Sequence, residues 1–230
     1  MTTDSIIVAL DFDEADQALL LVRQIKDYLS CFKVGSQLFT REGPAFIEKL
    51  RALGVDVFLD LKFHDIPETV RKAVRAAAAL DLKFLTIHAS GGRAMMESAL
   101  EGARGTRTTV LGVTVLTSLE DAALAEIGYR QTAREQVVHL AKLARASGLG
   151  GLVCSPLEIE PLREALGSEM KLVTPGIRGA ADAAGDQRRT LSAAEALRRG
   201  ADHLVVGRPI TAAPDPVAAA LGILKEIGRL

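Results

Sequence analysis

Apolar residues alternate along the chain between short continuous runs and longer stretches with helical spacing. The short runs have the length and the Val, Ile and Leu content of buried parallel strands, and the longer stretches repeat apolar residues every three or four positions. The predicted strands cover residues 5–10, 31–35, 55–62, 84–89, 109–116, 151–154, 171–174 and 203–206. The predicted helices cover residues 14–29, 42–53, 66–80, 92–104, 119–127, 132–147, 156–166, 192–199 and 215–228.

Strands and helices that alternate in this way form a parallel sheet with right-handed crossovers. Eight such units in 230 residues fit a single-domain (β/α)8 TIM barrel over residues 1–230 better than an open doubly wound sheet. The open sheet is the alternative fold. No Gly-x-Gly-x-x-Gly motif follows the first predicted strand, which disfavours a dinucleotide-binding protein.

Composition and charge narrow the classes of partner. A formal net charge of -1 makes neither nucleic acid nor a membrane surface the expected main partner. No signal peptide is visible after Met1, and no run approaches the ~18 apolar residues of a membrane span, so a cytoplasmic location is expected. Cys31 and Cys154 both lie in apolar segments and are expected to be buried, reduced thiols rather than a disulfide or metal ligands.

Several predicted strands carry charged or polar residues where they end, which is where barrels of this kind place their chemistry. Asp11 follows the first strand, Lys33 ends the second, and Asp60 and Lys62 end the third. A structural ion network that pins the rim is one interpretation. Four charges of alternating sign at one rim favour a catalytic site instead. The other strand ends carry His88, Thr117, Ser118, Ser155, Thr174, Gly176, Gly207 and Arg208.

The third strand carries an acid and a base on one face. Side chains at positions i and i+2 of a strand point the same way, so Asp60 and Lys62 are expected to lie together, and Asp65 follows the strand. Burying such charges on an otherwise apolar strand costs free energy, so a purely structural role for them is disfavoured. The two carboxylates should favour the ammonium form of Lys62, which suits a general acid better than a Schiff-base nucleophile.

The last two strand ends predict a phosphate site. Gly176 and Arg178 follow the seventh strand, and Gly207 and Arg208 follow the eighth. Barrels often bind phosphate with these two loops, because glycine permits close backbone approach and arginine offers a two-pronged donor. The polar stretch 176–191 lacks periodicity and predicts a lid, with a plain surface loop as the alternative.

No cofactor and no metal are expected from the pattern of ligand-type residues. Asp11, Asp60 and Asp65 could in principle hold Mg²⁺. The histidines show no metal-ligand spacing with one another or with the cysteines; they are His64, His88, His139 and His203. His139 is expected at the surface or in packing, and His88 as a satisfied core histidine.

Together these motifs resemble those of the orotidine 5'-phosphate decarboxylase family. The resemblance is carried by Asp-Leu-Lys-Phe-His-Asp-Ile-Pro-Glu-Thr at 60–69, Val-Leu-Thr-Ser at 115–118, Pro-Gly-Ile-Arg at 175–178, Gly-Asp-Gln-Arg-Arg at 185–189 and Val-Gly-Arg-Pro-Ile at 206–210, with Asp11 and Lys33. The Asp-x-Lys-x-x-Asp core alone is shared across a wider suprafamily. Combined with the Gly-Asp-Gln-Arg-Arg stretch, it is specific.

The resemblance implies the cofactor-free conversion of orotidine 5'-monophosphate to UMP and CO₂, the last step of de novo pyrimidine biosynthesis. By this resemblance Lys62 protonates C6 of the pyrimidine, Asp60 lies near the leaving carboxylate, and Lys33 bridges the ribose and the charges. The resemblance also assigns Asp11 to a ribose hydroxyl, Thr117 to the pyrimidine edge, and Arg178, Gln187, Gly207 and Arg208 to the phosphate.

The resemblance further implies a homodimer with shared active sites, in which Asp65, Ile66 and Thr69 reach into the partner subunit's site. The nearest competing function is that of a Mg²⁺-dependent 3-keto-L-gulonate 6-phosphate decarboxylase-like enzyme of the same suprafamily. Such enzymes have glutamate where Lys33 stands, and Lys33 and Gln187 argue against it. A Schiff-base aldolase and a non-catalytic phosphate-binding barrel are two further candidates for the function.

Overall fold

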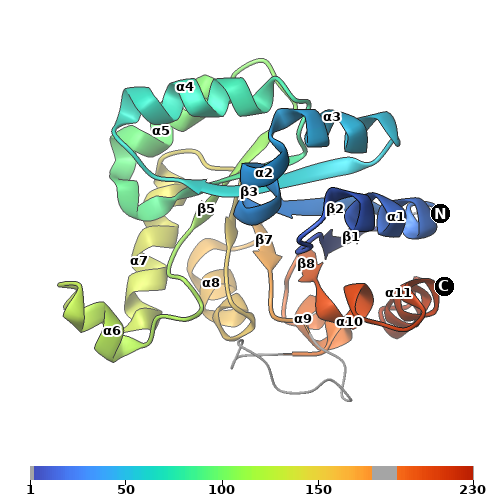
Figure 1. Ribbon diagram of the computed structural model, residues 1–230. Helices are drawn as coiled ribbons and strands as arrows, with labels where there is room; N and C mark the ends of the chain where they lie inside the picture. Colours follow the sequence, from blue (N-terminus) through green and yellow to red (C-terminus); the bar gives the residue numbers. More distant parts are fainter. Residues whose placement is uncertain (1–2, 178–190, 230) are drawn as a thin grey trace.

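The computed structural model describes residues 3–177 and 191–229, and its strands close into a parallel barrel (Figure 1). Each strand pairs with the next along the chain, and β1 pairs with β8. The predicted (β/α)8 fold is therefore confirmed over the open sheet. The strands are β1 (Thr3–Ala9), β2 (Leu29–Gly35), β3 (Asp56–Phe63), β4 (Phe84–His88), β5 (Thr109–Val113), β6 (Gly151–Val153), β7 (Lys171–Thr174) and β8 (His203–Val206).

Helices surround the barrel and connect its strands (Figure 1). Among the described helices, none has the length and apolarity that a bilayer crossing requires. The α-helices are α1 (Ala15–Ile25), α2 (Ser36–Glu42), α3 (Pro44–Ala52), α4 (Pro67–Ala78), α5 (Gly92–Ala103), α6 (Asp121–Glu126), α7 (Ala133–Ala146), α8 (Ile159–Leu166), α9 (Ala193–Arg198), α10 (Arg208–Thr211) and α11 (Pro216–Glu226). Short 3₁₀ turns, η1 (Ala89–Gly91) and η2 (Pro156–Glu158), precede α5 and α8.

The predicted boundaries differ from the structure where a local feature overrides hydrophobic periodicity. The predicted helix 42–53 is α3, and a further short helix, α2, precedes it. Gly43 separates the two with a φ of 67°, a left-handed conformation that ends one helix before the next begins. The predicted strand 109–116 ends at Val113, and the predicted helix 14–29 ends at Ile25.

Two apolar clusters fill the fold. The larger one lies between the barrel and its helices, and the smaller one fills the barrel interior, where Phe58 and Phe84 meet edge to face at 5.9 Å between ring centroids. Cys31 lies in the interior cluster and Cys154 in the outer one; both are buried and free, as predicted. Burial raises the pKa of each thiol to about 12, so neither is a ready thiolate.

A network of ion pairs lies at the amino-terminal end of the strands. The Lys83 ammonium lies 3.0 Å from Asp4 Oδ1 and 3.5 Å from Asp56 Oδ2. Arg107 pairs with Asp56 at 2.8 Å and with Asp81 at 2.7 Å. The hydrogen bond from Lys83 holds the pKa of Asp4 below its usual value. These residues stand at the starts of β1, β3, β4 and β5, so the network ties four strands together where the barrel begins.

Helices α4 and α5 pack side by side along one edge of the molecule (Figure 1). Gly102 of α5 faces the backbone of α4 so closely that a Cβ atom there would lie 2.4 Å from the carbonyl oxygen of Arg71. A backbone atom cannot move aside as a flexible side chain can. Glycine at this position therefore sets how closely the two helices approach.

We expect Gly102→Ala to lower the free energy of unfolding by about 1–3 kcal/mol, because α4 and α5 must separate to make room for the methyl group. Gly222→Ala is the matched control, since Gly222 lies in α11 with nothing within 4 Å of an added Cβ. That variant should be stabilised by about 0.5–1 kcal/mol, the usual gain in helix propensity. Chemical denaturation of both variants measures the difference; equal stabilities would contradict the packing argument.

Candidate active site

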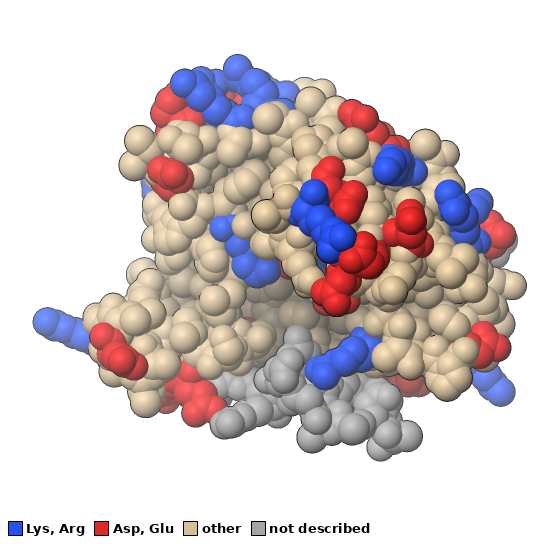
Figure 2. Space-filling view, in the orientation of Figure 1, with Lys and Arg blue, Asp and Glu red and all other residues tan. Residues whose placement is uncertain are grey.

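A cavity of about 970 Å³ opens at the carboxyl ends of the strands. Figure 2 shows the molecule hollowed near the centre of one face, with basic and acidic side chains around the hollow. Apolar side chains from the barrel form its floor, and charged or polar residues from the strand ends form its sides. The lining residues are Ala9, Asp11, Lys33, Phe58, Asp60, Lys62, Val113, Val115, Leu116, Thr117, Val153, Cys154, Pro175, Gly176, Ile177, Val205, Gly207, Arg208, Pro209, Ala212, Ala213 and Pro214.

Four charged residues from the first three strand ends meet on one side of this cavity. We call Asp11, Lys33, Asp60 and Lys62 the charge cluster. The Asp60 carboxylate is its centre: Oδ2 lies 2.9 Å from Lys62 Nζ and 3.9 Å from Lys33 Nζ. Lys33 also contacts Asp11 Oδ1 at 3.0 Å. The side chains of Lys33 and Asp60 are only 12% and 13% exposed, so these charges interact with little screening by water.

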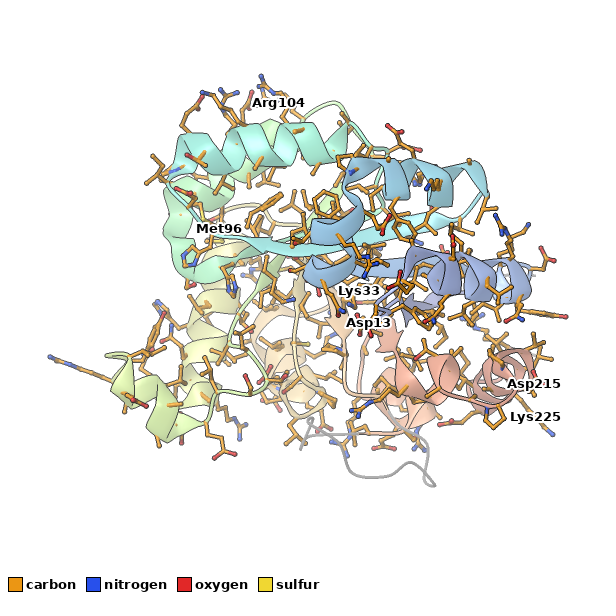
Figure 3. All side chains as sticks on the ribbon, viewed as in Figure 1. Asp13, Lys33, Met96, Arg104, Asp215 and Lys225 are labelled. Atoms are coloured by element: carbon orange, nitrogen blue, oxygen red, sulfur yellow. The ribbon has the colours of Figure 1, made fainter. Side chains whose placement is uncertain are left out.

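A glycine and a hydrogen-bonded polar pair lie beside the charge cluster. A Cβ atom on Gly35, at the end of β2, would lie 3.3 Å from Lys33 Nζ, so glycine there keeps the space beside the ammonium open. Just outside the cluster, Gln37 Nε2 donates to Asp13 Oδ1 at 2.5 Å. Figure 3 shows Lys33 and Asp13 close together near the barrel mouth, far from Asp215 and Lys225 on the outer part of the fold.

The backbone at Lys62 departs from a regular strand. Between the pairs Leu59–Leu85 and Phe63–Ile87, β3 advances by four residues while β4 advances by two. Lys62 has a φ of 52°, a left-handed conformation that costs a non-glycine residue roughly 1–2 kcal/mol. Strand alternation correctly predicted that Asp60 and Lys62 lie together. The contact is nevertheless made across a bulge rather than along a regular strand face.

Lys62 forms an ion pair inside the cavity. Its Nζ donates a hydrogen bond to Asp60 Oδ2 at 2.9 Å, and the Lys62 side chain is 34% exposed. Cys154 also lines the cavity, but its pKa near 12 makes it a poor nucleophile. Within residues 3–177 and 191–229, no three His, Cys, Asp or Glu side chains are grouped as metal ligands would be.

Another part of the cavity wall is formed by the segments that follow β7 and β8. Gly176, Gly207 and Arg208 line it, as the sequence predicted for a phosphate site. The two other residues assigned to phosphate, Arg178 and Gln187, lie outside the described residues, as does most of the predicted lid 176–191. The described ends of that stretch come together, since Ile177 and Leu191 form an isolated parallel bridge.

Asp65, Ile66 and Thr69 do not line the chain's own cavity. All three are exposed at the end of β3 and the start of α4, and Ile66 has 67% of its surface exposed although it is apolar. The Asp65 carboxylate accepts a hydrogen bond from the backbone N–H of Ile66 at 2.6 Å.

The remaining polar strand ends do not line the cavity either. The rings of His88 and His64 lie 5.3 Å apart between their centroids, tilted by 38°. His139 does not end a strand; it lies in α7 and is exposed. Burial, with His64 and Lys62 nearby, lowers the pKa of His88. Ser155 and Thr174 are fully buried, and Ser118 is exposed without lining the cavity.

Sequence reasoning missed Thr86, which hydrogen-bonds both Asp60 and Lys62 from β4. It also did not predict that 208–211 form the short helix α10, and it missed the turn after α10, which contributes Ala212, Ala213 and Pro214 to the cavity. Thr86 has a weak signal in the sequence, as a polar residue within the apolar run Phe84–Ile87. The contribution of Ala212, Ala213 and Pro214 has none, because these residues carry no charge and lie outside the motifs described above.

Comparisons with known proteins agree with this geometry. The family model described as "Orotidine 5'-phosphate decarboxylase / HUMPS family" matches residues 4–223. The chain is 49% identical to an orotidine 5'-phosphate decarboxylase of Nitrosococcus oceani, with all of both chains covered. It is 52% identical to one of Actinobacillus succinogenes, with 98% of each chain covered.

A solved structure gives the same result for the fold. The crystal structure of orotidine 5'-phosphate decarboxylase from Lactobacillus acidophilus is 41% identical in sequence and superposes with a TM-score of 0.86, covering 96% of this chain and 98% of that one. The cavity, its charge cluster and the match along nearly the whole sequence lead to one conclusion. The chain belongs to the orotidine 5'-phosphate decarboxylase / HUMPS family.

Proposed function

We propose that this protein decarboxylates orotidine 5'-monophosphate to UMP and CO₂ without a cofactor, with Lys62 as the proton donor. The observation that carries the proposal is the Asp60 carboxylate held between the ammonium groups of Lys62 and Lys33, in a cavity that Arg208 also lines. A pyrimidine carboxylate beside the charge cluster and a phosphate beside the arginine would then occupy the same cavity.

The reaction needs a cation where negative charge develops. When the bond between C6 and the carboxylate breaks, CO₂ leaves and its bonding electron pair stays on C6. That carbanion is poorly delocalised, so it must be stabilised by fixed charges. The Lys62 ammonium stabilises it and then transfers a proton to C6, which completes UMP. Lys62 is left as the neutral amine and regains its proton from water.

The remaining parts of the substrate are assigned to other residues that line the cavity or the recess beside it. A recess of about 230 Å³ beside the charge cluster is lined by Asp11, Lys33 and Gln37, polar groups that suit ribose hydroxyls. Thr117 lines the main cavity and is assigned to the pyrimidine edge, and Gly207 and Arg208 to the phosphate. Binding the phosphate far from C6 supplies free energy for holding the reacting end in a desolvated position.

A homodimer with shared sites is part of the proposal. The exposure of Asp65, Ile66 and Thr69, and their absence from the chain's own cavity, support their assignment to the partner subunit's site.

We expect Lys62→Ala to lower kcat by at least about 10⁴-fold, because one change removes both the proton donor and the cation beside C6. Lys225→Ala, which removes an exposed lysine of α11, is the control and should keep the wild-type rate. The fall in absorbance as orotidine 5'-monophosphate is consumed measures both rates. Near-wild-type turnover by Lys62→Ala would refute the proton-donor assignment.

We expect Arg208→Ala to raise the KM for orotidine 5'-monophosphate by about 10–100-fold, the usual loss when a charge-assisted hydrogen bond to a ligand is removed. It should also lower kcat, because phosphate binding contributes to the chemical step. Orotidine, which lacks the phosphate, should be turned over equally by variant and wild type. Arg134→Ala, at an exposed arginine of α7, controls for the loss of charge. An equal loss with both substrates would contradict the phosphate assignment.

Mixing two inactive variants tests the shared sites. Lys62→Ala and Asp65→Ala should each be inactive alone. In a mixed dimer the Asp65→Ala subunit keeps its own Lys62 and receives Asp65 from its partner. Equal mixing followed by subunit exchange should therefore restore roughly a quarter of wild-type activity. Failure to recover activity, with mixed dimers shown by native mass spectrometry, would place Asp65 outside the partner's site.

A further inference from the structure

Thr86 is a fully buried threonine in the middle of β4 that touches both central members of the charge cluster. Its Oγ1 accepts a hydrogen bond from the backbone N–H of Lys62 at 2.9 Å. The same Oγ1 lies 2.9 Å from Asp60 Oδ1. A hydroxyl group has a single proton, and an ionised carboxylate can only accept. The direction of both bonds is therefore determined: Lys62 donates to Thr86, and Thr86 donates to Asp60.

The first of these bonds supports the bulge in β3. In the pairing of the two strands, Asp60, Leu61 and Lys62 lie opposite Thr86 alone. A residue in such a bulge loses its regular place in the ladder of backbone hydrogen bonds. The threonine hydroxyl instead satisfies the N–H of Lys62, the residue with the left-handed backbone. A partly buried N–H without a partner would favour a different backbone path.

The second bond orients the carboxylate. The torsion that turns an aspartate carboxylate has broad minima, so the group rotates unless its oxygens are held. Thr86 holds Oδ1 of Asp60, and the other oxygen, Oδ2, then faces Lys62 Nζ at 2.9 Å and Lys33 Nζ at 3.9 Å. One hydroxyl thus determines which oxygen the two ammonium groups share.

We propose that Thr86 is a positioning residue, whose hydroxyl sets the backbone of Lys62 and the orientation of Asp60 for proton transfer. Thr86 does not line the cavity and so acts through these two residues rather than on the substrate. This inference rests on the proposed function for its kinetic consequence. Its structural consequence, the protection of the Lys62 amide, is independent of which substrate the protein uses.

Thr86→Val keeps the size and branching of the side chain and removes the hydroxyl. We expect kcat to fall by about 10²-fold, the loss typical of a small misplacement of catalytic groups, with KM for orotidine 5'-monophosphate nearly unchanged. Thr86→Ser keeps the hydroxyl and should stay within about fivefold of wild-type kcat. The amide of Lys62 should exchange with deuterium faster in Thr86→Val than in wild type, and at the wild-type rate in Thr86→Ser.

Thr108→Val is the matched control. Thr108 is also a buried threonine, its hydroxyl donates to the carbonyl of Leu82 at 3.1 Å, and it precedes β5 at the opposite end of the barrel. It should lose a similar hydrogen bond without a change in kcat. If Thr86→Val does not fold, Thr86→Ala compared with Thr86→Ser isolates the hydroxyl in the same way.

Wild-type kcat in Thr86→Val would overturn the inference, as would an equal loss in Thr86→Ser, which would assign the effect to the methyl group. Unchanged exchange of the Lys62 amide would overturn it as well. Absence of orotidine 5'-monophosphate decarboxylation by the wild type would instead overturn the proposed function. In that case, amide exchange in the same variants still decides the role of Thr86.

Discussion

The carboxylate of Asp60 between two lysine ammonium groups is the interaction on which the site depends. Removing these charges from water is unfavourable, and the cost is offset only when opposite charges lie close together and the remaining polar atoms are paired. Neighbouring strands of a closed barrel meet these conditions, because β2 supplies Lys33, β3 supplies Asp60 and Lys62, and β4 supplies the hydroxyl of Thr86. Losing any one of them would leave a partly buried polar group without one of its partners.

The bulge at the end of β3 shows how a local departure from regular structure serves the site. A regular strand would direct only alternate residues toward the cavity and would keep the spacing between Asp60 and Lys62 at that of the pleat. The left-handed backbone at Lys62 allows its long side chain to fold back to the carboxylate two residues before it. The backbone strain is balanced by contacts that exist only in the folded barrel, which is typical of strained residues at functional sites.

Much of this arrangement could be predicted from the sequence. Apolar runs located all eight strands, and the polar residues at or just after the strand ends included Asp11, Lys33, Asp60 and Lys62 of the cavity. Hydrophobic periodicity could not predict the register shift opposite Thr86, because the shift depends on how two strands pair. It also could not separate Thr117, which lines the cavity, from Thr174, which is buried beside Cys154, since both follow apolar strands. The proposed contribution of Asp65 to a partner subunit's site is not visible within one chain, because Asp65 does not line the chain's own cavity.

The ion-pair network of Asp4, Asp56, Asp81, Lys83 and Arg107 lies at the end of the barrel opposite the cavity. The strands begin at this end, and the charge cluster lies near their other end. The ion-pair network and the charge cluster therefore share no residue. Substitutions in the network can therefore change the stability of the barrel without replacing a residue that lines the cavity. Stability and turnover can for this reason evolve through changes at different ends of the same strands.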